Sequence, residues 1–295
     1  MAKPEAIEID GVRVTSPDKE LYPGEGITKR RLIDYYRAVA PAMLHHIAER
    51  PVSLVRCPEG IENAQNPCFY QRHPGKRAIP FMTELAVEGI AEHFLRIAEP
   101  GGLISAVQMG TLEIHCWGSQ AGAPAAADRL VFDLDPGEGL GFADVVAGAH
   151  DVRAMLDEMG LVGFAKTTGG KGLHVVAPVR TTASWQEVKA FARATGDRMR
   201  ERWPDRYLIR NFIAERVGKI YIDYLRNDWA ATAVAPYSTR ARRGATVSVP
   251  LGWDEVVPDL DPQRLTIDTV PQRLATIGDP WRDMASFTRD LPLQH

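Results

Sequence analysis

Cysteine is scarce in this chain, and its spacing excludes two kinds of stabilised module. The 295 residues contain three cysteines, Cys57, Cys68 and Cys116, an odd number with wide separations and no CxxC pair. Zinc ribbons need closely spaced cysteine pairs, and disulfide frameworks need an even set. We therefore expect neither a structural zinc module nor a disulfide framework.

Long apolar runs and an excess of positive charge are also missing. No apolar run approaches the roughly 18 residues that span a bilayer, and the start MAKPEAIEID lacks a signal-peptide core. These absences predict a cytoplasmic protein with no membrane partner. The net charge of -3 argues against a protein that binds nucleic acid over its whole surface. Basic clusters at 28–32, 238–244 and 206–219 form either a local basic groove or solvated faces.

The order of the expected elements predicts an α/β fold with mixed or antiparallel sheets flanked by helices, because few clean βαβ alternations occur. Asp10-Gly11 predicts a hairpin turn, Thr28 caps a helix over 29–40, and Pro41 begins a following helix. No linker or repeat is visible. We expect one domain over 1–295: an N-terminal portion to about 110, a catalytic portion to about 255, and an extended tail from 256 onward that wraps over the body.

Residues 131–139, VFDLDPGEG, place two aspartates in a strand-like apolar stretch that Pro136 and Gly137 end. Successive side chains of a strand alternate between faces, so Asp133 and Asp135 point the same way. Two like charges side by side are costly unless a cation, a proton or solvent relieves them. The stretch therefore predicts either a metal site or a solvated strand end beside a turn.

A third aspartate has a similar setting in KIYIDYL, where Asp223 shares a strand face with Lys219 and Tyr221. Three carboxylates borne on strands can hold two divalent ions, and hard oxygen ligands suit Mg²⁺ or Mn²⁺. Two such ions stabilise both the attacking and the leaving oxygen in phosphoryl transfer. For Asp223 alone, an ion pair with Lys219 or Arg226 is the alternative.

The glycine loop TTGGKGLH, at 167–174, offers backbone amides that can cradle phosphate oxygens, with Lys171 adding charge and Thr168 a hydroxyl. It is not a P-loop, because Ala165 occupies the first glycine position and a strand follows. A glycine-rich turn with a solvated lysine is the alternative interpretation. His174, at the end of the loop, is either a ligand contact or a core histidine.

Two further segments suggest contacts with a nucleotide or a base. PYSTRARR places Arg240, Arg242 and Arg243 after a strand, where they suit paired hydrogen bonds to a triphosphate. The adjacent Phe69 and Tyr70 offer a surface on which a base can stack, although burial of one of them is the commoner arrangement.

Four segments in order, DRLVFDLDPGEG, TTGGKGLHVVAP, KIYIDYLRN and TAVAPYSTRAR, closely resemble the polymerase domain of bacterial ATP-dependent DNA ligase D. That domain belongs to the archaeo-eukaryotic primase superfamily. The resemblance runs from SPDKELYP near the start to DPW at 279–281. It implies a primase-like fold, with an RRM-like catalytic half, in a single primase-polymerase domain.

The resemblance also implies roles for matching residues. The metal ligands would be Asp133, Asp135 and Asp223, and His115 would lie near the primer end and the metals. The nucleotide would be bound by Thr168, Lys171, Gly172, His174, Arg226, Asn227 and Arg240. The DNA contacts would be Lys19 and Lys29 on the 5′-phosphate at a gap or break, and Phe69 and Tyr70 on the template.

From these matches we expect a template-dependent polymerase that adds ribo- or deoxynucleotides to primer 3′ ends at gaps and double-strand breaks in bacterial non-homologous end joining. It would use two Mn²⁺ or Mg²⁺ ions, with NTP or dNTP as substrates. Its partners would be 5′-phosphorylated gapped or broken DNA, Ku and a DNA ligase. We expect a monomer in the cytoplasm, on the nucleoid when bound to DNA. The alternatives are a two-metal phosphodiesterase or nuclease and a catalytically silent DNA-end-binding module.

Overall fold

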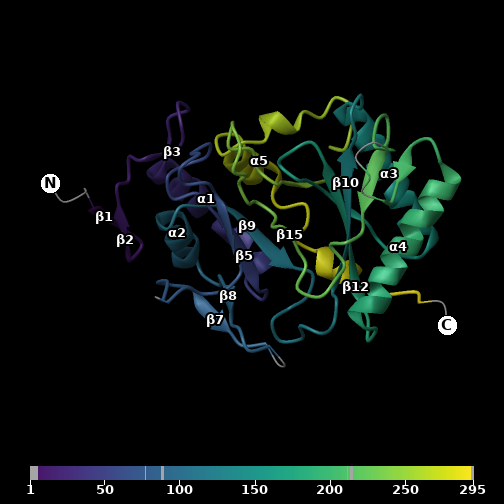
Figure 1. The fold of residues 1–295 in the computed structure, drawn as a ribbon, viewed down its shortest axis with the longest axis horizontal. Helices are drawn as coiled ribbons and strands as arrows, with labels where there is room; N and C mark the ends of the chain where they lie inside the picture. Colours follow the sequence, from purple (N-terminus) through teal and green to yellow (C-terminus); the bar gives the residue numbers. More distant parts are fainter. Residues whose placement is uncertain (1–5, 77, 88–89, 211, 213–214, 294–295) are drawn as a thin grey trace. The chain divides into compact units, whose positions relative to one another are not determined.

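The computed structural model describes residues 6–76, 78–87, 90–210, 212 and 215–293. The chain separates into two compact units. Unit 1 comprises Met1–Cys116, Val234–Ser248 and Gln263–Gly278; unit 2 comprises Trp117–Ala233, Val249–Pro262 and Asp279–His295. Helices flank antiparallel and mixed sheets (Figure 1), which confirms the predicted fold class. That residues 1–295 act as one domain stays a prediction.

The sheet strands that lie in unit 1 have the order β9-β5-β8-β7, and β6 also pairs with β5. The early elements of unit 1 are β1 (Ala6–Ile9), β2 (Val12–Thr15), β3 (Glu20–Tyr22), β4 (Ile27–Thr28) and α1 (Lys29–Ile47). The sheet strands and remaining helices are β5 (Val52–Arg56), β6 (Phe69–Gln71), β7 (Thr83–Leu85), β8 (Phe94–Arg96), α2 (Pro100–Gln108), β9 (Thr111–Trp117) and α5 (Val270–Ile277). Strand β15 (Thr232–Val234) begins in the chain segment of unit 2 and ends at the first residue of the next segment of unit 1.

Local signals account for the first elements of unit 1. The β1–β2 hairpin turns through Asp10 and Gly11, both with positive φ, as the sequence predicts. Thr28 caps α1 by accepting a hydrogen bond from the backbone N–H of Arg31 at 3.3 Å. Tyr22 of β3 and Tyr35 and Tyr36 of α1 are almost completely buried and contribute to the core.

Unit 2 contains a seven-stranded sheet with the order β13-β14-β10-β12-β11-β16, and β17 pairs with β12. The strands are β10 (Arg129–Pro136), β11 (Phe164–Thr167), β12 (Leu173–Arg180), β13 (Tyr207–Leu208), β14 (Ile220–Asp223), β16 (Pro250–Leu251) and β17 (Arg289–Asp290). The helices are α3 (Phe142–Glu158), α4 (Trp185–Arg202) and the short 3₁₀ turns η2 (Pro262–Arg264) and η3 (Met284–Phe287).

Helices α3 and α4 lie beside β10 and β12 and cover one face of this sheet (Figure 1). Gly148 of α3 approaches the side chains of Leu134 and Ile220, and Gly196 of α4 approaches Ile222. These apolar side chains are almost completely buried. Because strand residues alternate between faces, the aspartates of β10 and β14 point away from the two helices.

Three features differ from the sequence expectations. Helix α1 continues through Pro41, which lies on its exposed side, where solvent can hydrate the carbonyl that proline leaves without a partner. Cys57 and Cys68 form a disulfide although their spacing had indicated no such bond. The tail contains α5, so the expectation of an extended segment from 256 onward was wrong. No helix in the described part of the chain is long and apolar enough to cross a membrane.

Gly137 is a point of close backbone approach. Its N–H donates to Lys219 O at 2.9 Å, and a Cβ at this position would lie 1.6 Å from Arg216 O. A second hydrogen bond runs in the opposite direction, from Gly218 N–H to Glu138 O at 2.8 Å. The end of β10 is thereby held against residues 216–219 through backbone atoms, and no larger side chain fits between them.

We predict that Gly137→Ala lowers the free energy of unfolding by about 1–3 kcal/mol, because backbone atoms must move to admit the methyl group. Gly122→Ala is the matched control, since a Cβ there meets nothing within 4 Å. It should change stability by less than about 0.5 kcal/mol. Urea denaturation of the two variants measures the difference; equal effects would contradict the close approach.

Candidate active site

The three aspartates predicted as metal ligands lie on one face at the end of β10 and β14. Asp133 is directly opposite Asp223, and Asp135 is opposite Tyr221. Directly opposite residues of an antiparallel pair share a face, as do residues two apart along a strand. The alternation seen in the sequence and the pairing seen in the structure therefore bring three carboxylates onto adjacent strands.

Asp133 is buried, with 5% of its surface exposed, and is surrounded by positive or hydrogen-bonding groups. Its Oδ2 accepts hydrogen bonds from Nη2 and Nε of Arg226 at 3.2 and 3.3 Å. His174 Nε2 lies 3.2 Å from Oδ1. Burial would raise the pKa of Asp133, but His174, Arg226 and Lys166 hold that pKa below its usual range. Asp133 is thus ionised at neutral pH.

The other two carboxylates are less well compensated. Burial and the charge of Asp133 raise the pKa of Asp135 to about 6. Burial, with Asp133 again contributing, also raises the pKa of Asp223, although Leu225 N–H donates to its Oδ1 at 2.8 Å. Within the described residues no group of three His, Cys, Asp or Glu could hold a metal ion as it stands. Metal ligation by these aspartates stays a prediction.

Lys166 is a site residue that the sequence analysis missed. It lies on β11 opposite His174, which is itself opposite Asp133 on β10, so the three share one face. Lys166 is 2% exposed, and burial and its charge lower the pKa of His174 to about 4. His174 is therefore neutral at pH 7. The sequence signal for Lys166 was its position between Ala165 and Thr167 in a buried strand. Lysine is almost never fully buried unless a partner compensates its charge, so this position indicates a site with such a partner.

The glycine loop reaches the end of β10. Thr168 closes the loop by donating from Oγ1 and its backbone N–H to Gly172 O, both at 3.1 Å. A Cβ on Gly172 would lie 2.6 Å from Leu134 O, so only glycine allows this approach. Asp135 is next to the same position. Lys171 is exposed at the loop tip, and phosphate binding by Thr168, Lys171 and Gly172 stays a prediction.

Asn227 joins the segment after β14 to β10. Its Oδ1 accepts from Val131 N–H at 2.8 Å, and its Nδ2 donates to Val131 O at 2.7 Å and to Tyr224 O at 2.9 Å. Asn227 is 1% exposed. In this structure its amide is thus engaged with backbone groups, and it positions the neighbouring Arg226. Its predicted contact with the nucleotide remains untested.

A second cluster lies within unit 1, around a carboxylate that the sequence analysis also missed. Glu113 Oε2 accepts a hydrogen bond from His115 Nε2 at 2.8 Å. Its Oε1 accepts from Ala241 N–H at 2.9 Å and lies 3.0 Å from Arg240 Nε. Burial would raise the pKa of Glu113, but His115 and Arg240 lower it to about 2. Glu113 and His115 are two residues apart on β9, so their side chains lie on the same face of the strand. This spacing is the sequence signal that could have identified Glu113.

Arg240 is held beside β9 by the segment that precedes it. Ala235 N–H donates to Ile114 O at 2.9 Å, and Ile114 N–H donates to Ser238 Oγ at 2.8 Å. Tyr22 of β3 donates from its hydroxyl to Arg240 O at 2.8 Å. The predicted triphosphate arginine and the predicted primer histidine thus share one carboxylate partner through fixed backbone contacts.

The predicted DNA contacts also lie in unit 1. Phe69 and Tyr70 are 46% and 42% exposed, so neither aromatic ring is buried. The Tyr70 ring packs edge-on against His115, with ring centres 5.8 Å apart. Lys19 and Lys29 are joined by a backbone hydrogen bond from Lys29 N–H to Lys19 O at 2.9 Å. Stacking on a template and binding of a 5′-phosphate remain predictions.

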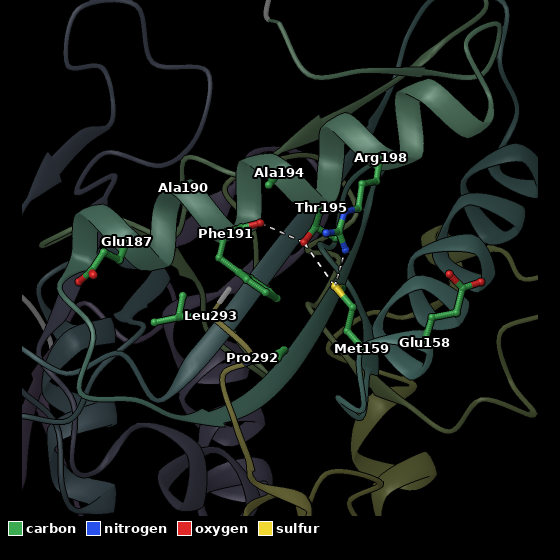
Figure 2. Close-up of a pocket in the computed structure, with 10 residues that line it drawn as sticks. All are labelled: Glu158, Met159, Glu187, Ala190, Phe191, Ala194, Thr195, Arg198, Pro292 and Leu293. Carbon is green, nitrogen blue, oxygen red and sulfur yellow. Dashed lines mark hydrogen bonds between the residues drawn. The ribbon is translucent and has the colours of Figure 1, made fainter. Parts of the chain in front are cut away.

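A cavity of about 680 Å³ lies elsewhere in unit 2, beside α4 (Figure 2). Phe191, Ala194 and Leu293 form part of its apolar wall, and Thr195 and Arg198 both approach Met159 Sδ. None of the site residues predicted from the sequence lines it. The candidate chemistry is therefore at the strand ends, and this cavity is separate from it.

Glu113 provides a pH-dependent test of the unit 1 cluster. Because its folded pKa is lowered, its ionisation stabilises the fold above its unfolded pKa of about 4.5, and this stability is lost as the pH falls toward 2. Relative to Glu113→Gln, wild type should gain up to about 3 kcal/mol between pH 5 and 7 that disappears in acid. Denaturant titrations from about pH 2 to pH 7 measure the gain and its loss in acid; a difference between the two proteins that stays constant over this whole range would contradict the proposed network.

Asn227 can be tested as a structural clamp. Asn227→Leu should lower the free energy of unfolding by about 2–4 kcal/mol, because Val131 N–H and C=O would be buried without partners. The exposed Asn66 supplies a control, and Asn66→Leu should leave stability nearly unchanged. If Asn227→Leu instead kept full stability and only weakened nucleotide binding, the clamp would be the wrong interpretation.

Comparison with known proteins agrees with this geometry. The family model described as LigD, primase-polymerase domain, matches residues 28–281. The multifunctional non-homologous end joining protein LigD of Pseudomonas aeruginosa is 37% identical over 279 residues, which cover 93% of this chain and 33% of that protein. The protein of the same name from Mycolicibacterium smegmatis is 34% identical, covering 91% of this chain and 35% of the relative. The chain thus spans about a third of the length of these relatives.

A solved structure is similar over nearly the same extent. The polymerase domain from Mycobacterium tuberculosis ligase D in complex with DNA aligns with a TM-score of 0.85 and 34% identity. The alignment covers 93% of this chain and 98% of that one. With a family match over residues 28–281 and relatives above 30% identity over nine-tenths of its length, the chain belongs to the LigD primase-polymerase domain family.

Proposed function

We propose that this domain is a template-dependent nucleotidyltransferase, which extends primer 3′ ends at gaps and breaks in DNA. The observation that supports this most strongly is the row of Asp223 and Asp133 on paired strands, with Asp135 beside them at a raised pKa of about 6. Three carboxylates kept close together with incomplete counter-charge favour the binding of cations. A purely structural sheet end has no need for this arrangement.

The donor set fits hard divalent ions. Asp133, Asp135 and Asp223 offer only carboxylate oxygens, which suit Mn²⁺ or Mg²⁺. We propose that these residues hold two ions. When bound, such ions lower the pKa of a primer 3′-hydroxyl and neutralise triphosphate charge. Burial, with the charge of Asp133 contributing, raises the pKa values of Asp135 and Asp223, and a bound cation would favour the ionised form of both carboxylates.

The chain's own residues then bind and orient the substrate. Gly172 of the glycine loop lies beside Asp135, and the amides of the loop, with Lys171 and Thr168, would receive phosphate oxygens. Arg226 is already shared between Asp133 and Asp223, at 3.2 and 3.6 Å, so it can balance charge as phosphate enters. In unit 1, Glu113 orients Arg240 for a phosphate contact and His115 for the primer end.

The substrates and partners that we propose are those implied by membership of the LigD primase-polymerase domain family. We propose that the domain uses Mn²⁺ readily, accepts ribo- and deoxynucleotides, and binds 5′-phosphorylated gaps through Lys19 and Lys29. Phe69 and Tyr70, both exposed, would stack on the template. Relatives named for non-homologous end joining support a role beside Ku and a DNA ligase. We further propose a monomer that acts on the nucleoid in the cytoplasm.

Asp135→Asn is the sharpest test of catalysis. The neutral amide keeps the shape of the carboxylate, and because the folded pKa of Asp135 is raised, loss of its charge should leave the fold at least as stable. Extension of a labelled primer across a short gap with a 5′-phosphate should fall at least about 100-fold. The assay uses Mn²⁺ or Mg²⁺ with NTP or dNTP.

Asp157→Asn is the matched control, because Asp157 is an exposed residue of α3 whose nearest cation, Arg153, is 3.9 Å away. It should extend the primer like wild type. Primer shortening without added nucleotide would indicate a nuclease instead. If wild type binds the gap but neither extends nor shortens the primer, the domain is an end-binding module and the catalytic proposal fails.

A further inference from the structure

A buried ammonium group in unit 1 lies on a chain segment that is hydrogen-bonded to a second lysine. Lys29 is 6% exposed, and its Nζ donates to Thr15 O at 2.7 Å and to Gln108 Oε1 at 3.2 Å, both neutral acceptors. Burial and the nearby charge of Lys19 lower the pKa of Lys29. The hydrogen bond from Lys29 N–H to Lys19 O holds the two lysines on adjacent segments of backbone, and their charges repel each other. Such a pair needs an anion to balance it.

Glu59 supplies part of that balance. Its Oε2 lies 2.6 Å from Lys19 Nζ, and its charge also acts on Lys29. The side chains of Lys19 and Glu59 are 32% and 49% exposed, so solvent and a ligand can both reach the pair. One carboxylate facing two lysines leaves a net positive charge at a position open to solvent.

The backbone around Glu59 is held in place. Cys57 and Cys68 close the loop that contains it by a disulfide. Gly60 N–H donates to Cys57 O, and Ile61 N–H donates to Leu21 O, both at 2.9 Å. Leu21 lies on β3, directly after Lys19 and Glu20. The carboxylate is thus presented to Lys19 by an anchored loop, which limits the entropy cost of keeping the pair.

We propose that Glu59 is an intramolecular competitor for the 5′-phosphate of a DNA end, and so sets the affinity of the domain for phosphorylated ends. This inference rests on the proposed function, in which Lys19 and Lys29 receive that phosphate. A terminal phosphate carries about -1.5 to -2 charge and three acceptor oxygens, whereas the carboxylate carries one charge. The phosphate can therefore displace Glu59 from Lys19, and a 5′-hydroxyl cannot.

Displacement has a consequence for salt dependence. Lys19 exchanges one anionic partner for another, so its capture of phosphate releases fewer counterions than an unpaired lysine would. Glu59, once freed, attracts a cation from solution. Removing the carboxylate should thus strengthen binding of phosphorylated ends and also make that binding more sensitive to salt.

The test is fluorescence anisotropy of a labelled gapped duplex carrying either a 5′-phosphate or a 5′-hydroxyl, with the full chain in non-reducing buffer and without nucleotide. Glu59→Gln should tighten binding of the phosphorylated gap about fivefold, and binding of the hydroxyl gap by less than about twofold. The slope of log K against log salt should steepen by about one for the phosphorylated gap.

Glu62→Gln is the matched control, because Glu62 lies on the same loop but pairs with Arg243 at 2.5 Å. Glu62→Gln should leave the affinity unchanged for both the phosphorylated gap and the hydroxyl gap. A Lys19→Ala background should abolish the effect of Glu59→Gln, since the competition acts through Lys19.

The outcomes separate the two proposals. If wild type does not prefer the phosphorylated gap, the assignment of Lys19 and Lys29 fails, and this inference fails with it. If wild type prefers the phosphorylated gap but Glu59→Gln changes neither the affinity nor the salt slope, the proposed role of Lys19 and Lys29 is retained. The competitor role of Glu59 is then overturned. An equal gain for both ends would also overturn it, because that result indicates general repulsion.

Discussion

A carboxylate buried within a sheet must be matched by positive charge, and the arrangement around Asp133 depends on this constraint. The pairing of β10 with β12 and β14 places His174 on one side of Asp133 and Asp223 on the other. Neither neighbour carries positive charge at neutral pH, so compensation comes from farther along the row. Lys166 provides it from β11, and Arg226 provides it from the segment after β14. The charge of one aspartate thus accounts for cations on two other segments of chain.

Close backbone approach is the second requirement of the site. The glycine loop can lie against the end of β10 only because Gly172 has no side chain, and residues 216–219 can do so only because Gly137 has none. Asn227 then holds the segment that carries Arg226 against Val131. The close backbone contacts at Gly137 and Gly172 bring polar side chains near one another at this edge of the sheet. Helices α3 and α4 cover the opposite face, so this face remains available to the polar side chains.

Much of this could be predicted from the sequence, because it depends on periodicity over a few residues. Alternation along a strand placed Asp133 and Asp135 on one face, and Thr28 and Asp10-Gly11 gave correct local boundaries. What was missed depends on how one segment of chain is placed against another, which periodicity within a segment does not show. The register of β11 against β12 places Lys166 opposite His174. The loop between Cys57 and Cys68 folds back so that the two cysteines form a disulfide. Glu113 was visible on the face of His115, but its contact with Arg240 joins two segments that are far apart in the sequence.

The two-way backbone contact between 137–138 and 216–219 has a consequence for building hybrid proteins. Each segment donates an N–H to the other, so the turn after β10 and the turn before β14 match each other in shape as well as in position. A chimera that takes one turn from a relative and keeps the other would join two surfaces that were not selected together. Grafts of this edge of the sheet should therefore exchange both turns together, even though almost 80 residues of sequence separate them.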